Sequence, residues 1–281
     1  MEGFTHNLQE KYNPTVEEAY KVLRTNIQFC GFDKKIKSIA VTSCNPGEGK
    51  TTTSINLAIS MAKTGMKVLL VDADMRKPMH VKHLGWGISS GLSNIISRCA
   101  NMADALNRTN IEGLDYIACG PKPPNPAELI GSPRFKEFIG EACEEYDIVI
   151  LDTPPLGSVI DCAIVATSVD GVLLVVQSKA AEYCSVQRVK EQLEKVNARI
   201  LGVVLNKLDK KDYKAYYGYY NYYKSTLSFR SVYGSWIRKL ANGLLKRNGR
   251  KQIRVSEDAH EPDMGIKTIH EGVRTAKAVG R

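Results

Sequence analysis

The 281-residue sequence predicts a doubly wound α/β fold, in which helices cover both faces of a mostly parallel sheet. Short runs of Val, Ile and Leu alternate with longer amphipathic stretches through the middle of the chain. These runs are apolar at nearly every position, as expected of strands that are buried on both faces. A glycine-rich segment that ends in Gly-Lys-Thr lies between the first apolar run and the first amphipathic stretch.

Six apolar runs are predicted as strands, and three amphipathic stretches between them are predicted as helices. The strands are residues 36–43, 67–74, 114–120, 147–153, 171–177 and 200–208. The helices are residues 50–65, 126–146 and 181–197, and Pro133 is expected to break the second of them. In such sheets ligands bind at the carboxyl ends of the strands, so functional residues are expected there.

The chain divides into four predicted segments: 1–30, an N-terminal helical segment; 31–210, the α/β domain; 211–224, a tyrosine cluster; and 225–281, a flexible tail. The net charge is +9, and residues 224–281 hold 13 Lys and Arg against five Asp and Glu, so the basicity belongs to the tail. The seven cysteines are scattered without a CxxC pair, which favours reduced thiols in the cytoplasm. No apolar run approaches the roughly 18 residues of a membrane span, and the N-terminus lacks the features of a signal peptide.

The segment CNPGEGKT, residues 44–51, has the form of a phosphate-binding loop between a strand and a helix, although its first position is Cys44 instead of Gly. Backbone N–H groups of the loop and the helix N-terminus would bind phosphate oxygens, Lys50 would reach the β- and γ-phosphates, and Thr51 would bind Mg²⁺. The predicted nucleotide-binding residues are Asn45, Pro46, Gly47, Glu48, Gly49, Lys50, Thr51, Thr52 and Asn206.

Three carboxylates end two of the predicted strands. Asp152 ends IVILD, and Asp72 and Asp74 end VLLVDAD, with Arg76 shortly after them. Three acids are too many for Mg²⁺ alone, so one of them could act as a general base. The alternative for Asp72 is that it caps its strand and hydrogen-bonds a neighbouring loop. Composition and spacing thus indicate an Mg²⁺-dependent nucleotide hydrolase or phosphoryl transferase, and leave the acceptor open.

The segments CNPGEGKT, LLVDADMRKP and IVILDTPP resemble, in order and spacing, the Walker A, A′ and B motifs of the bacterial tyrosine kinases, the cytoplasmic kinases of capsule and exopolysaccharide synthesis. GPKPPNPAELIGSPRF, residues 120–135, is also similar to that family, and so is the cluster of seven tyrosines at 213–223. The resemblance covers roughly residues 17–223 and implies a P-loop NTPase fold of the MinD-like group.

The resemblance implies a homo-oligomeric kinase that uses ATP and Mg²⁺ to phosphorylate its own C-terminal tyrosines in trans. Carried over by position, Lys50 and Thr51 hold phosphate and metal, Asp74 and Asp152 serve Mg²⁺, Asp72 is the base for the tyrosine hydroxyl, and Arg76 stabilises charge or a subunit contact. The implied phosphoacceptors are Tyr213, Tyr216, Tyr217, Tyr219, Tyr220, Tyr222 and Tyr223. The implied partners are a membrane-embedded activator of polysaccharide polymerisation, at the inner face of the membrane, and a cognate tyrosine phosphatase. No nucleic acid is implied.

Two segments depart from the family pattern. Glu18, Lys21 and Arg24 occupy the oligomer-contact pattern E-x-x-R-x-x-R, with Lys at the first Arg position; without the family they would be a solvated helix face. The chain also continues well beyond the tyrosines, and residues 235–247 place apolar side chains at helix-like spacing among basic ones. Both a membrane-surface helix and a disordered solubilising tail remain open for this stretch.

Three other functions compete with the kinase. A partitioning ATPase of the ParA/MinD type would carry a signature lysine where this chain has Asn45. A GTPase would use NKLD, residues 206–209, to read guanine, but Asp152 is followed by Thr-Pro-Pro and not by x-x-Gly. A nucleotide-dependent scaffold of the polysaccharide machinery is compatible with every motif.

Overall fold

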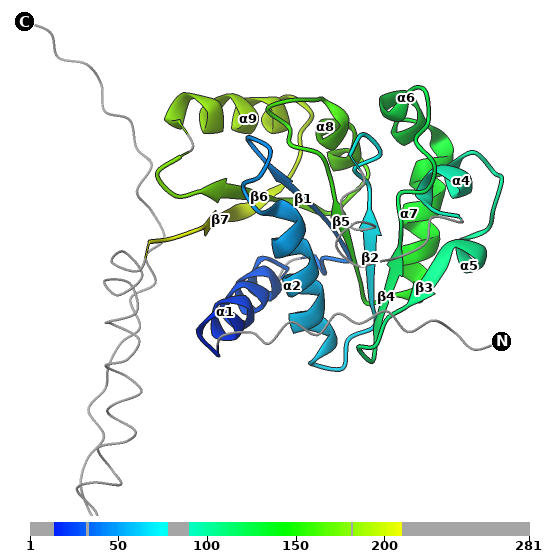
Figure 1. Ribbon diagram of the computed structural model, residues 1–281, viewed down its shortest axis with the longest axis horizontal. Helices are drawn as coiled ribbons and strands as arrows, with labels where there is room; N and C mark the ends of the chain where they lie inside the picture. The colour runs from blue at the N-terminus through cyan, green and yellow to red at the C-terminus, as the bar shows by residue number, and fades with distance from the viewer. Residues whose placement is uncertain (1–13, 32–33, 78–89, 181, 210–281) are drawn as a thin grey trace, which may run out of the picture. The chain divides into compact units, whose positions relative to one another are not determined.

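The computed structural model describes residues 14–31, 34–77, 90–180 and 182–209 (Figure 1). The predictions made for residues 1–13, for the tyrosine cluster at 211–224 and for the basic tail at 225–281 lie outside the described residues. Within the described part of the chain, no helix is long and apolar enough to cross a membrane.

The described residues form a seven-stranded sheet with the order β3-β4-β2-β5-β1-β6-β7. Its strands are β1 (Ser38–Ser43), β2 (Val68–Asp72), β3 (Leu106–Arg108), β4 (Leu114–Ile117), β5 (Ile148–Asp152), β6 (Gly171–Gln177) and β7 (Ile200–Asn206). All neighbours pair in parallel except β3, which runs antiparallel to β4 at the edge. The register sets Asp72 at the end of β2 opposite Asp152 at the end of β5.

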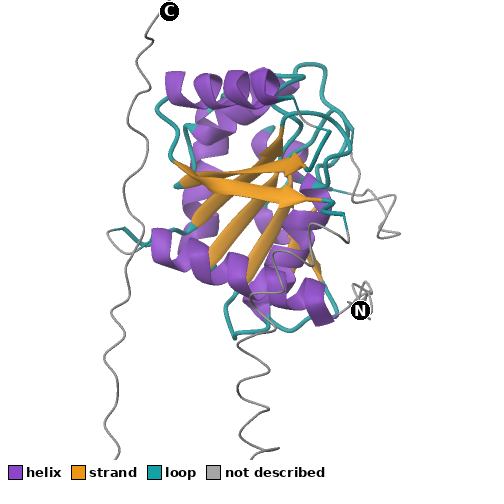
Figure 2. Cartoon of the chain, turned by 90° about the vertical axis from the view of Figure 1, so that its left-hand side faces the viewer, coloured by secondary structure: helices purple, strands orange, loops and turns teal. Residues whose placement is uncertain are grey.

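Helices lie on both faces of this sheet (Figure 2). They are α1 (Pro14–Cys30), α2 (Lys50–Ala62), α4 (Leu92–Ile96), α5 (Met102–Ala105), α6 (Pro126–Ile130), α7 (Pro133–Glu145), α8 (Asp161–Ala166) and α9 (Tyr183–Lys195). One hydrophobic cluster joins α1 and α2 to one face of the sheet, and a second joins α4, α7, α8 and α9 to the other face. The predicted doubly wound fold is confirmed.

All six predicted strands are present, and the helix predicted at 126–146 is broken as expected, since Pro133 begins α7. The short elements β3, α4, α5 and α8 were missed. Each has only three to six residues, which is too short for a helical or strand period to stand out from the surrounding sequence. The antiparallel edge strand β3 is also only partly buried, so its residues are not a continuous apolar run.

Candidate active site

The loop between β1 and α2 turns through two glycines with positive φ. Gly47 has φ +80° and Gly49, which precedes α2, has φ +97°. A Cβ on Gly49 would lie 2.1 Å from the side-chain nitrogen of Asn206, whereas a Cβ on Gly47 would have no atom within 4 Å. Glycine is therefore required at Gly49 for both its backbone conformation and its close approach to β7, and at Gly47 for conformation alone.

This difference gives a matched pair of variants. Gly49→Ala is expected to weaken nucleotide binding by more than about tenfold. The added methyl must displace Asn206, and an alanine held at this positive φ costs about 1–3 kcal/mol of backbone strain. Gly47→Ala meets only the strain and should bind nucleotide more tightly than Gly49→Ala. Titration with a fluorescent ATP analogue, beside thermal unfolding of both variants, measures the difference. Equal losses in the two variants would contradict the role of the Asn206 contact.

The Glu48 side chain folds back under the loop instead of pointing to solvent. Its carboxylate accepts hydrogen bonds from the backbone N–H groups of Cys44 at 2.8 Å and Asn45 at 3.1 Å, and from the Asn45 side-chain amide at 3.3 Å. Glu48 is only 3% exposed. The sequence predicted that Glu48 binds nucleotide through its backbone, but not that its side chain hydrogen-bonds to the loop itself.

Cys44, at the position that is usually Gly, is a buried thiol. Burial, with a smaller contribution from the Glu48 charge, raises the pKa of Cys44 to about 11. The thiol is therefore protonated at neutral pH and is not an activated nucleophile.

The acids and the loop lysine meet at the carboxyl edge of the central strands. Lys50 Nζ lies 3.3 Å from the Asp74 carboxylate and 4.0 Å from the Asp152 carboxylate. Thr51 donates its hydroxyl to Asp152 at 2.6 Å, and Ser54, one turn further along α2, donates to the other carboxylate oxygen at 3.2 Å. The parallel pairing of β2, β5 and β1 brings these residues together from three segments. Ser54 was missed, although its spacing of four from Lys50 places it on the same face of α2.

The same residues suit Mg²⁺. Thr51 and Asp152 supply a hydroxyl and a carboxylate side by side, and Asp74 supplies a second carboxylate next to Lys50. No group of three or more His, Cys, Asp or Glu side chains forms a metal cage in the described residues. Mg²⁺ commonly binds through one or two protein carboxylates and completes its shell with waters and substrate phosphates, so these donors fit it.

Asp72 is fully buried at the end of β2. One of its carboxylate oxygens accepts the backbone N–H of Asp74 at 3.0 Å, and the next carboxylate along, Asp74, accepts the N–H of Lys77 at 3.0 Å. These contacts fix the turn after β2. They agree with the capping alternative for Asp72, while its place opposite Asp152 also keeps it beside the phosphate site.

Arg76 makes a two-pronged ion pair with Asp161. Its Nε donates to one oxygen of the Asp161 carboxylate at 2.8 Å, and its Nη2 donates to the other at 2.9 Å. Hydrogen bonding by Asp161 raises the pKa of Arg76, burial opposes this, and the charges of Asp161 and Asp74 add to it. Sequence reasoning missed Asp161, because no short motif links it to an arginine 85 residues away.

Residues at the end of β7 hydrogen-bond to the phosphate loop. Asn206 donates its side-chain amide to the Glu48 carbonyl at 2.9 Å, and Lys207 donates Nζ to the Gly47 carbonyl at 2.6 Å. Lys207, which was not predicted as a site residue, holds a positive φ of 54°. Asp209, the residue that would read guanine in a GTPase, forms an exposed ion pair with Lys179 at 2.8 Å. The first two residues of NKLD thus hold the phosphate loop.

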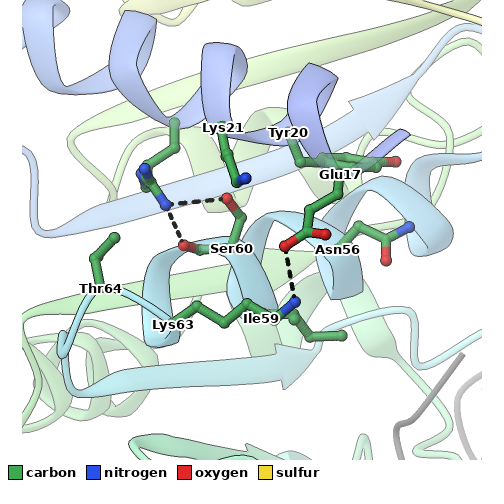
Figure 3. A pocket seen from close by; sticks show the side chains of 9 residues that line it. Glu17, Tyr20, Lys21, Asn56, Ile59, Ser60, Lys63 and Thr64 are labelled. Carbon is green, nitrogen blue, oxygen red and sulfur yellow. Dashed lines mark hydrogen bonds and ion pairs between the residues drawn. The ribbon is translucent and has the colours of Figure 1, made fainter. Parts of the chain in front are cut away.

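The three predicted oligomer-contact residues lie on α1, and two of them, Lys21 and Arg24, line a pocket of about 380 Å³ between α1 and α2 (Figure 3). Arg24 donates to the Ser60 carbonyl of α2 at 2.6 Å and to its hydroxyl at 3.3 Å. Glu18 and Lys21 pair with each other at 3.6 Å. Arg24 therefore helps to hold α1 on α2 within one chain. The contact of these residues with a second copy stays a prediction.

An ion pair makes a second contact between α1 and the end of α2. Lys63, which directly follows α2, lies 3.1 Å from Glu17 on α1, as the dashed line in Figure 3 marks. Both side chains are exposed by more than a third, so the pair adds little to stability on its own.

Comparison with known proteins identifies the arrangement. Residues 36–207 match the family model described as an AAA domain. The chain is 42% identical over 191 residues to the tyrosine-protein kinase YwqD of Bacillus subtilis, an overlap of 67% of this chain and 80% of that relative. It superimposes on the kinase domain of the Escherichia coli tyrosine kinase ETK with a TM-score of 0.66 and 30% identity, covering 73% of this chain and 84% of that domain.

A more distant neighbour shares the fold alone. The septum site-determining protein MinD of Pyrococcus horikoshii, solved with Mg-ADP, matches with a TM-score of 0.51 and 24% identity over 60% of this chain and 69% of that one. The predicted MinD-like fold is confirmed, while the much higher identity to the named kinases separates the chain from the ATPase alternative. The chain belongs to the family of bacterial tyrosine kinases.

Proposed function

We propose that this chain transfers the γ-phosphoryl group of ATP, with Mg²⁺, to tyrosines 213–223 of another copy of itself, and thereby regulates capsule or exopolysaccharide synthesis. The observation that carries the proposal is the buried group of Lys50, Asp74 and Asp152 at a glycine-turned phosphate loop, with Thr51 on Asp152. The family membership supplies tyrosine as the acceptor.

Each site residue has one task in this proposal. The loop N–H groups and Lys50 bind the phosphates and oppose the negative charge that the transferred group carries. Thr51, Asp152 and Asp74 hold Mg²⁺, which, when bound, neutralises phosphate charge. Asp72 accepts the proton of the incoming tyrosine hydroxyl. Asn206 holds the loop on the side of β7 through its hydrogen bond to the Glu48 carbonyl, and we assign it contact with the nucleotide as well.

The position of the tyrosines along the chain supports this acceptor. The described residues end at Asp209, just after β7 reaches the edge of the sheet where Asn206 and Lys207 contact the phosphate loop. Tyr213 follows four residues later, a span of at most about 14 Å of extended chain. The first acceptor tyrosine is therefore separated by only a short length of chain from the edge of the sheet that carries the phosphate site.

The proposed setting is the cytoplasm at the inner face of the membrane. A membrane-embedded activator would recruit the kinase, a homo-oligomer would present one chain's tyrosines to the next, and a cognate phosphatase would reverse the modification. The Glu18, Lys21 and Arg24 face of α1 is the proposed oligomer contact. Contact of the basic tail at 225–281 with anionic lipid is an additional proposal, which rests on its charge and on the helix-like spacing of apolar side chains at 235–247.

Phosphosite mapping tests the acceptor. After incubation with ATP and Mg²⁺ in the presence of the activator, phosphate is expected on the 213–223 tyrosines. The described tyrosines provide internal controls: Tyr116 and Tyr146 are buried, whereas Tyr183 is 80% exposed at the start of α9. Modification of Tyr183 to the same extent as the cluster would mean that exposure alone selects the acceptor.

Mixing two variants tests transfer between chains. A chain with Lys50→Met keeps all seven tyrosines, and a chain with all seven tyrosines changed to Phe keeps the active site. Phosphate on the Lys50→Met chain in the mixture is the expected result. An unmodified 213–223 segment in the mixture and in the parent protein would end the proposal.

A further inference from the structure

The ion pair between Arg76 and Asp161 joins two loops at the edge of the phosphate site. Arg76 follows β2, two residues after Asp74, and Asp161 begins α8, nine residues after Asp152. β2 and β5, which end in Asp72 and Asp152, are direct neighbours in the sheet. The pair therefore fastens together the two segments that follow the proposed catalytic acids.

Asp161 is a fixed point. Its carboxylate is fully buried, and the next residues of α8, Cys162, Ala163 and Val165, are almost completely buried in the hydrophobic cluster. Both carboxylate oxygens accept from the same guanidinium, at 2.8 and 2.9 Å. Such paired hydrogen bonds set the plane of the guanidinium as well as its distance.

Arg76, the other partner of the ion pair, is less buried than Asp161. Its side chain is 39% exposed, and Asp161 accepts two of the five N–H groups that a guanidinium carries. The loop on which Arg76 stands is tied at its base by the Ala73 N–H, which donates to the Asp152 carbonyl at 2.8 Å, and by the hydrogen bond from the Asp74 N–H to Asp72. Asp74 in the same loop contacts Lys50.

If the contact served stability alone, two apolar side chains could join these segments at a lower cost in desolvation. Burying a charged pair costs desolvation that two apolar side chains would avoid, so a buried carboxylate on a partly exposed arginine adds little to folding. The paired hydrogen bonds from Arg76 to Asp161 instead fix the orientation of the guanidinium. A guanidinium fixed in one plane holds positive charge on the loop whose Asp74 contacts Lys50, next to the site where phosphate would be transferred.

We propose that Asp161 is a positioning residue for phosphoryl transfer, which orients the Arg76 guanidinium and, through it, the loop that carries Asp74. This inference rests on the proposed function, since it assigns Asp161 to the same site. It predicts that Asp161 acts only through Arg76 and that its loss lowers the rate of transfer more than the affinity for nucleotide.

A double-mutant cycle with Asp161→Asn, Arg76→Gln and both together tests this on the full chain with its activator. Asp161→Asn keeps the shape of the side chain and removes its charge. We expect kcat for autophosphorylation to fall by about 100-fold, as for a misplaced reacting group, while KM for ATP changes by less than about threefold. The double variant should be no slower than the slower single variant. Arg76→Lys, which keeps the charge without the fork, should stay close to Arg76→Gln.

Three results would overturn the inference. The first is a kcat of Asp161→Asn within about twofold of the parent. The second is a double variant whose fold-loss of kcat equals the product of the losses in the two single variants. The third is a loss of kcat that is matched by an equal loss of nucleotide binding and by a loss of thermal stability. The same cycle run on ATP hydrolysis separates this inference from the proposed function. If hydrolysis shows the coupling and the tyrosines stay unmodified, Asp161 positions phosphoryl transfer and the acceptor assignment is wrong.

Discussion

Replacing Lys50 by Met is expected to lower tyrosine phosphorylation by about a thousandfold, the upper range for loss of one group that stabilises transition-state charge. Lys50 is 7% exposed and stands between two carboxylates, 3.3 Å from Asp74 and 4.0 Å from Asp152. Met fills a similar volume without the charge. The variant therefore loses the cation that would hold the β- and γ-phosphates, and it also leaves two buried carboxylates without a countercharge.

The second effect should appear in the protein without nucleotide. Removing one partner of a buried ion pair costs about 3–5 kcal/mol, so Lys50→Met is expected to unfold at lower temperature than the parent. Mg²⁺ should stabilise the variant by more than it stabilises the parent, because the metal restores positive charge between Asp74 and Asp152. Thermal unfolding with and without Mg²⁺ measures this beside the phosphorylation rate.

Lys63→Met is the matched control. Lys63 directly follows the same helix, α2, and also pairs with a carboxylate, Glu17, but its side chain is 51% exposed. An exposed pair of this kind is screened by solvent and contributes little to stability, so the variant should keep both its stability and its phosphorylation rate. Retention of more than about a tenth of the parent rate by Lys50→Met would remove Lys50 from the proposed mechanism.

The Lys50→Met variant also addresses the scaffold alternative. In cells it should fail to support normal polymer length if phosphoryl transfer is what the protein supplies. Normal polymer with an inactive kinase would mean that the folded chain, and not its chemistry, serves the assembly machinery.

The features that could be predicted from sequence are those that depend on residues close together in the chain. Apolar runs mark the six buried strands, and the loop from Cys44 to Thr51 is defined by spacing that a strand, a turn and a helix impose. Parallel pairing then brings Lys50, Asp74 and Asp152 to one edge, since Lys50 opens α2 after β1, Asp74 follows β2 and Asp152 ends β5.

The features that could not be predicted join residues far apart in sequence. The bond from Lys207 to the Gly47 carbonyl spans 160 residues, and the bond from Arg76 to Asp161 spans 85. The sequence around Lys207, Arg76 or Asp161 contains no motif that identifies the residue it contacts. The Arg24 bond to Ser60 is a related case, because helix spacing predicts only that Arg24 shares a face with Glu18 and Lys21, not what that face contacts.

Asp152→Asn is expected to raise the Mg²⁺ concentration needed for half-maximal phosphorylation by at least about tenfold, the lower range for altered metal-site partners. The carboxylate accepts the Thr51 hydroxyl at 2.6 Å and the Ser54 hydroxyl at 3.2 Å. An amide has the same shape, and its oxygen can still accept a hydroxyl, so the fold should persist. What disappears is the negative charge that draws Mg²⁺ to the Thr51 hydroxyl.

Asp170→Asn separates loss of metal binding from loss of a hydrogen-bonded carboxylate. Asp170 precedes β6 at the opposite edge of the sheet, where it accepts the backbone N–H groups of Lys37 at 3.0 Å and Ser38 at 3.1 Å. Its change should lower stability without moving the Mg²⁺ requirement, because it is remote from the phosphate loop. Asp152→Asn should show the reverse pattern, with a shifted Mg²⁺ titration at near-parent stability. If saturating Mg²⁺ fails to recover any of the lost rate in Asp152→Asn while Asp74→Asn responds to the metal, then Asp74 and not Asp152 provides the protein's main charge for Mg²⁺.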